Sequence, residues 1–136
     1  MTRREIREHI FLMLFRKDFH KAGELNEQME LYISEINEPT VDEYAYLTGR
    51  FHSVLEKLHE IDRILSEVST GWKLDRMGKV DLTLLRLAAF EMIFDDDIPV
   101  KVAINEAVEL AKKFGGDETP AFINGVLAKV VDRSSL

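Results

Sequence analysis

Three arginines near the start of the chain are the first residues whose type and spacing could do chemistry. On a helical wheel Arg3 and Arg7 share the side that carries the apolar positions Ile6 and Ile10, and Arg4 directly follows Arg3. A guanidinium in line with an apolar stripe must be paired inside the protein or lie where the stripe meets a partner. The sequence leaves both possibilities open, and the second would place a phosphate or a base against this helix.

A second candidate surface lies in the last helical stretch, "TPAFINGVLAK". Its small residues Ala121, Gly125 and Ala128 form a strip nearly opposite the apolar arc. Glycine costs a helix interior about 1 kcal/mol relative to alanine, so its presence suggests a close approach by something. A neighbouring helix packed on the strip is one explanation, and a nucleotide is the other. Phe122 lies at the border of the strip, where its ring could stack on a base.

No set of residues for catalysis, cofactor binding or metal binding is assembled. The chain has no Cys, and it contains no nucleophile motif, no phosphate-binding glycine loop and no dinucleotide fingerprint. His52 and His59 lack companion ligands at metal-site spacing, and Asp95–Asp97 is typical of a solvated loop. We therefore predict no catalytic residue, no cofactor and no metal, and a small enzyme is the least favoured function.

The net charge of −7 argues against nonspecific attraction to nucleic acid, but the charge is unevenly distributed. Residues 1–21 hold six basic and three acidic groups, a net charge of +3, whereas residues 22–69 hold three and eleven, a net charge of −8. No apolar run approaches the ~20 residues that span a bilayer, and no signal peptide is recognisable. We expect a cytoplasmic protein that makes no membrane contact.

Helix signals recur along the chain and strand signals do not. Capping boxes at "TRRE" and "TVDE" predict helices that begin after Thr2 and Thr40. Further helices are expected near residues 25–36, 80–94 and 100–114, the last ended by a left-handed Gly115, and Thr119 is expected to be the N-cap of a final helix. The sum is six to seven helices in one all-α domain over residues 1–136. In the apolar helix 80–94, Arg86 and Glu91 should each pair with a different neighbour.

Several motifs in order then resemble a known family. These are Trp72 and Arg76 in "W-x3-R", "LLRLAAFE", "IPVKVAINEAVELAKKFG" and "FINGVLAK". Together with the arginine-rich opening they resemble the NusB family of bacterial transcription antitermination factors. The resemblance implies two small helical bundles packed together. It also implies an RNA-binding adaptor that pairs with NusE, a protein of the small ribosomal subunit, on boxA RNA. The pair helps the RNA polymerase antitermination complex read through terminators, notably in ribosomal-RNA operons.

The resemblance also implies roles for individual residues. The arginine-rich start and a later aromatic position of the first helix correspond to RNA contacts, as do the acidic loop and the start of the last helix: Arg3, Arg4, Arg7, Phe15, Asp117, Glu118, Thr119 and Phe122. Related proteins often have Tyr where this chain has Phe15. The surface that faces NusE is expected to include Asp75, Arg76 and Asp81.

Two other readings stay open from the sequence. The acidic residues 22–69 would also suit a protein-only helical interaction module that meets a basic partner. A homodimer is possible if the apolar arc of the first helix is exposed, and such a dimer would hide the arginines.

Overall fold

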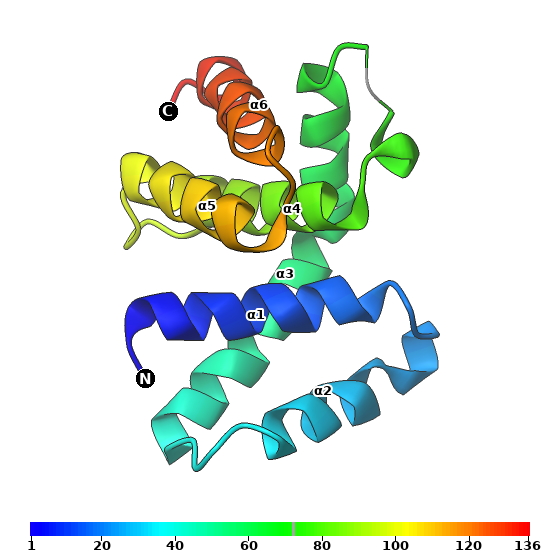
Figure 1. The fold of residues 1–136 in the computed structure, drawn as a ribbon, viewed down its shortest axis with the longest axis vertical. Coiled ribbons are helices and arrows are strands. Elements are labelled where there is room, and N and C mark those ends of the chain that lie inside the picture. The colour runs from blue at the N-terminus through cyan, green and yellow to red at the C-terminus, as the bar shows by residue number, and fades with distance from the viewer. Residues whose placement is uncertain (72) are drawn as a thin grey trace. The chain divides into compact units, whose positions relative to one another are not determined.

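The computed structural model describes residues 1–71 and 73–136 and shows a chain built from helices (Figure 1). The helices are α1 (Arg3–Lys17), α2 (Leu25–Ser34), α3 (Val41–Val68), α4 (Lys79–Phe94), α5 (Val100–Phe114) and α6 (Thr119–Ser134), with short 3-10 turns η1 (Ala22–Glu24) and η2 (Leu74–Arg76). No strand occurs among the described residues, so the predicted all-α class is confirmed. Trp72, which contributes to the family resemblance, lies outside the described residues.

The chain divides into two compact units, residues 1–55 and residues 56–136. Unit 1 contains α1, η1, α2 and the first part of α3; unit 2 contains the rest of α3, η2, α4, α5 and α6. Helix α3 therefore belongs to both units. No helix of the described chain is both long and apolar enough to cross a bilayer.

Both predicted capping boxes are present in unit 1. The Glu5 amide donates to Thr2 Oγ1 at 3.1 Å, and the Thr2 amide donates to Glu5 Oε1 at 3.3 Å. Thr40 and Glu43 repeat the pattern at 2.8 and 3.1 Å. Each box satisfies amides that the first helical turn leaves without partners, which explains why α1 and α3 begin where they do.

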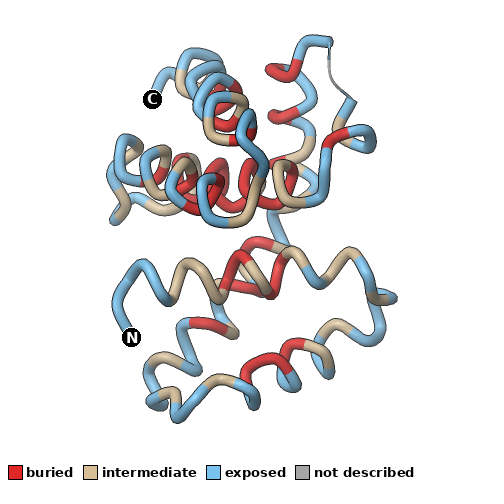
Figure 2. Tube along the Cα trace, viewed as in Figure 1, coloured by how far each residue is buried: buried red, intermediate tan, exposed pale blue. Residues whose placement is uncertain are grey.

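The core of unit 1 uses one face of each helix (Figure 2). The buried side chains are Ile10, Phe11, Met13 and Leu14 from α1, Met29, Tyr32 and Ile33 from α2, and Leu47, Phe51 and Val54 from α3. His9 Nδ1 lies 2.7 Å from the Tyr32 hydroxyl and so gives that buried group a partner. The centre of the α1 apolar arc is already buried in a single chain, so the exposed arc on which a homodimer would depend is not present there.

Unit 2 is organised around α4, which packs against α5 and α6, while α5 also packs against α6. Ten of its residues, from Leu82 to Met92, are buried (Figure 2). On α5 the buried positions Ala103, Ala107 and Ala111 recur every four residues, and small side chains there let helix axes approach closely. The burial of these residues explains why the predicted helix 80–94 is so rich in apolar side chains.

The charge pairing predicted for Arg86 is confirmed in unit 2. Arg86 Nε and Nη2 donate to the two carboxylate oxygens of Asp62 on α3, each at 2.8 Å. This fork-to-fork geometry suits a guanidinium and a carboxylate. The pair ties α4 to α3, so Arg86 has a structural role. Glu91 is 5% exposed and also interacts with other groups of the chain.

Candidate nucleic-acid interface

The arginines at the start of α1 lie at the protein surface of unit 1. Arg3 and Arg4 are exposed and Arg7 is half-buried. Arg4 and Arg7 also interact with other groups of the chain, although both still reach the surface where a ligand could contact them. The hydrogen bonds from the Thr2 backbone and side chain lower the pKa of Glu5, which keeps its carboxylate charged beside these arginines.

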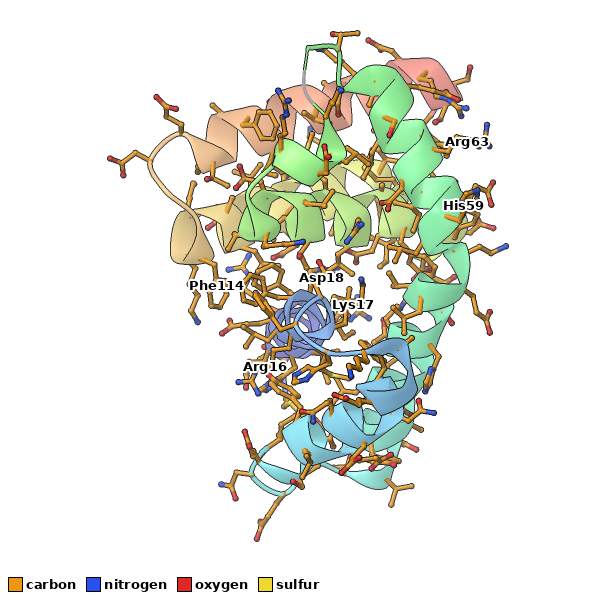
Figure 3. All side chains as sticks on the ribbon, turned by 90° about the vertical axis from the view of Figure 1, so that its right-hand side faces the viewer. Arg16, Lys17, Asp18, His59, Arg63 and Phe114 are labelled. Atoms are coloured by element: carbon orange, nitrogen blue, oxygen red, sulfur yellow. The ribbon has the colours of Figure 1, made fainter. Side chains whose placement is uncertain are left out.

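Arg16 and Lys17 at the other end of α1 have partners within unit 1, and Figure 3 labels both together with Asp18. The Arg16 guanidinium lies 4.8 Å from the centre of the Tyr32 ring, and Lys17 pairs with Asp18 at 2.5 Å. A cation held by a ring or a carboxylate contributes less to binding a phosphate. The charge of Lys17 is therefore largely neutralised by Asp18, whereas Arg3 and Arg4 in the first turn of α1 are exposed.

An aromatic row follows from the middle of α1. The Phe15 ring is half-buried, with its centre 6.1 Å from that of Phe11 and 5.4 Å from that of Phe19. Phe19 is 62% exposed and is the most exposed ring in this row. Phe19 lies beyond the end of the predicted first helix, so helical periodicity did not single it out. The four-residue spacing of the three rings was the signal that could have found it.

The turn between α5 and α6 in unit 2 is built around the Thr119 side chain. The Thr119 hydroxyl accepts from the Gly116 amide at 3.1 Å and donates to Asp81 Oδ1 on α4 at 3.2 Å. Thr119 is only 8% exposed. A Cβ atom at Gly115 would lie 2.6 Å from both Cβ and Cγ2 of Thr119, so the turn requires glycine there for reasons of space.

Two sequence predictions about this turn are wrong. Gly115 is extended, with φ −98° and ψ −178°, rather than left-handed. Thr119 is the first residue of α6 and Glu118 is the N-cap, so the Thr119 side chain bonds backwards to the turn and across to α4 instead of capping its own helix. The physical reason is common to both errors, because the Thr119 side chain fills the space beside Gly115.

The strip of small residues on α6 faces solvent. Ala121, Gly125 and Ala128 are exposed, and a Cβ atom at Gly125 would have no described atom within 4 Å. The packing of another helix onto this strip, one of the two explanations from the sequence, is therefore wrong for the described chain. Phe122 is half-buried beside the strip, and Asp117 and Glu118 are exposed just before it.

The residues expected to face NusE lie close together in the chain at the start of α4. Asp75 and Arg76 are exposed on η2, while Met77 directly after them is buried and anchors this short segment. Asp81 is half-buried in the first turn of α4. Its bond to Thr119 brings one expected partner residue into contact with one expected RNA residue. The arginines and Phe15 belong to unit 1, and the other expected site residues belong to unit 2.

The sequence and this architecture both match those of known proteins. The NusB family profile matches residues 4–132. The chain belongs to the NusB family. Transcription antitermination protein NusB of Lachnoclostridium phytofermentans is 61% identical over 97% of this chain and 100% of its own length. The Agathobacter rectalis protein of the same name is 56% identical over 95% and 98%.

Solved structures of NusB proteins have the same fold. The T. maritima NusB structure has a TM-score of 0.87 at 31% identity and covers 97% of this chain and 92% of that chain. A crystal structure of antitermination factors NusB and NusE in complex with double-stranded RNA has a TM-score of 0.84 at 29% identity and covers 96% of both chains. The helical fold of the described residues is thus shared with a NusB protein that was solved together with NusE and double-stranded RNA.

Proposed function

We propose that this protein is a transcription antitermination adaptor. It binds boxA RNA together with NusE and promotes read-through by RNA polymerase, notably in ribosomal-RNA operons. The observation that carries the proposal is the likeness, over nearly the whole chain, to a NusB protein solved with NusE and RNA. The adaptor acts without catalysis, in the cytoplasm, where it joins the polymerase antitermination complex.

The RNA contacts combine charge with stacking. Arg3, Arg4 and Arg7 donate to phosphates and base edges from the start of α1, and Phe15 and Phe122 offer rings for unpaired bases. The exposed Glu118 cannot pair with a phosphate. Its carboxylate can accept hydrogen bonds from base amino groups, which favours sequence selectivity over backbone affinity.

The NusE contacts use the segment from η2 to the first turn of α4. Asp75 and Arg76 are exposed with charges of opposite sign, which suits a complementary pair of charges on a partner. Asp81 contributes a carboxylate that binds Thr119 through one oxygen. A carboxylate offers about four lone-pair positions, so this bond leaves room for a partner's donor.

Fluorescence anisotropy on a short boxA RNA and a scrambled control, with and without NusE, tests the proposal. We expect selective binding that NusE tightens and that Arg7→Glu and Phe122→Ala both weaken. The control variant is Lys21→Glu, because Lys21 is exposed and lies outside the proposed contacts. Binding of equal strength to both RNAs, even with NusE present, would contradict the RNA role.

A salt series separates the proposed mode from nonspecific attraction. Each phosphate neutralised on a single strand contributes about −0.7 to the slope of log K against log salt. Three arginine contacts therefore predict a slope of about −2. A slope of about −4 or steeper, equivalent to six or more phosphates, would show that backbone attraction dominates.

The acidic residues between positions 22 and 69 keep a second candidate function in view. Helix α2 and the start of α3, which carry many of these acidic residues, also expose large apolar side chains: Leu31, Val41, Tyr44 and Tyr46. A protein-only module with a basic partner would use such a surface. Under that function Arg7→Glu leaves every measured association unchanged, which distinguishes it from the RNA adaptor in the same assay.

A further inference from the structure

The hydrogen bond between Asp81 and Thr119 joins the two surfaces that the proposed function assigns to different ligands. We propose that Thr119 is a positioning residue through which NusE binding beside Asp81 raises the RNA affinity of the start of α6. The inference rests on the proposed function. It adds a physical connection between the two binding events, which need not touch each other for their affinities to be coupled.

The proton of the Thr119 hydroxyl is committed to this connection. A hydroxyl has one proton to donate, and in this structure Thr119 donates it to Asp81 Oδ1. The oxygen accepts from the Gly116 amide at the same time, and the residue is 8% exposed. Thr119 therefore does not act as a donor to RNA while this bond exists. Its influence on RNA passes through the groups that it holds.

Those groups are the backbone of the turn and the first turn of α6. Gly116 and Thr119 are joined twice, by the bond from the Gly116 amide to the hydroxyl and by the Thr119 amide donating to the Gly116 carbonyl at 3.1 Å. Gly115 closes on the same side chain, with no space for even a Cβ atom. A shift of Thr119 must therefore move the turn with it, and Glu118 and Phe122 are attached directly to that turn.

Asp81 can transmit the effect of NusE binding to Thr119 because it lies at the end of α4 that the proposed function assigns to NusE. It is the third residue of the helix, and the N-cap is Gly78, which has no side chain to cap the free amides. A carboxylate in this first turn is favoured by the positive end of the helix dipole. A hydrogen-bond donor from NusE that binds the same carboxylate restricts the rotamers of Asp81. The restriction holds Asp81 Oδ1 in the position where it accepts from the Thr119 hydroxyl.

A thermodynamic cycle on the full chain measures this coupling. The quantity is the ratio of boxA RNA dissociation constants without and with saturating NusE. We expect a ratio of at least about 5 for the unaltered protein, the lower end of common allosteric coupling, and below about 2 for Thr119→Val, which keeps the shape but removes the hydroxyl. Thr119→Ser restores the hydroxyl and should restore the ratio.

Thr83→Val provides the matched control. Thr83 is also a buried threonine associated with α4, but its hydroxyl donates to the Lys79 carbonyl of its own helix at 2.7 Å. Its loss removes a buried hydroxyl without touching the turn, so the ratio should stay at the unaltered value. Reciprocity gives a second readout, because RNA must tighten NusE binding by the same factor and Thr119→Val must lower that factor equally.

The outcomes separate the inference from the proposed function. A high ratio that Thr119→Val retains overturns the coupling and leaves the adaptor function intact. A ratio near one in the unaltered protein overturns both the coupling and cooperation with NusE. If Thr119→Val fails to fold, amide NMR of the unaltered protein decides. NusE alone must then shift the Gly116 and Phe122 amide signals, and unchanged signals overturn the inference.

Discussion

Replacement of Gly115 by alanine tests the packing of the α5–α6 turn directly. Gly115 has a φ of −98°, which alanine adopts without strain, so the backbone does not oppose the change. The added Cβ atom would lie 2.6 to 2.7 Å from three side-chain atoms of Thr119. These contacts are far shorter than the ~3.5–4.0 Å at which carbon atoms attract one another. Thr119 or the turn must therefore move.

The expected cost of Gly115→Ala follows from two opposing effects. Overpacking in a closely packed place destabilises by about 1–3 kcal/mol. The lower entropy of the unfolded chain, when glycine becomes alanine, returns about 0.4–1 kcal/mol. We therefore expect a net loss of about 1.3 kcal/mol in the free energy of unfolding from the midpoints of these ranges, and of at most about 2.6 kcal/mol.

Urea denaturation of three glycine variants measures this effect with internal controls. A Cβ atom at Gly116 or at Gly125 would meet no described atom within 4 Å. Gly125→Ala should stabilise α6 by up to about 1 kcal/mol through helix propensity. Gly116→Ala should change stability by less than about 1 kcal/mol. If Gly115→Ala is as stable as the Gly116 variant, the steric argument for Thr119 is refuted.

Three further predictions concern charge and burial. Asp62→Ala should lower the free energy of unfolding by about 2 kcal/mol in urea denaturation, since it leaves the mostly buried Arg86 guanidinium without its carboxylate. An unchanged free energy of unfolding would mean that water replaces the carboxylate fully. The hydrogen bond from Arg133 lowers the pKa of Glu67 below 4.5, so the ion pair stabilises the fold above pH 4.5 and this contribution is lost as the pH falls. Glu67→Gln should therefore flatten the acid unfolding curve below pH 4.5, and an unchanged curve would contradict this. Burial raises the pKa of Tyr32 from 10 to about 12, so the contribution of Tyr32 to stability is complete below pH 10 and is lost as the pH rises through 12. Ultraviolet titration should show a late-ionising tyrosine, and complete ionisation of all tyrosines by pH 11 would refute the raised pKa.

Local sequence signals were enough to predict most helix starts. The capping boxes of Thr2 and Thr40 act within four residues, so the sequence alone contains both partners of each bond. The conformation of Gly115 was predicted wrongly because its cause is the side chain of Thr119, which the turn brings back onto it. A glycine required by space and a glycine required by a positive φ look the same in a sequence.

The sequence showed that certain residues need a distant partner, but it could not identify that partner. The apolar surroundings of Arg86 showed that it must pair, but Asp62 is 24 residues away and nothing local identifies it. The Asp81–Thr119 bond spans 38 residues and is equally invisible to helical periodicity. The solvent-facing strip at Gly125 was ambiguous for the opposite reason, since a pattern does not reveal whether another helix covers it.

The continuity of α3 has a consequence for how the chain folds. Starting a helix is unfavourable because several residues must be ordered for the first hydrogen bond, whereas each added residue brings a bond of its own. Since α3 runs unbroken from Val41 to Val68 through the division between residues 55 and 56, one nucleation event serves both units. Whichever unit collapses first presents the other with a helix end ready to be extended. Backbone bonds near residue 55 belong to neither unit alone, so they link the cooperative unfolding of one to that of the other.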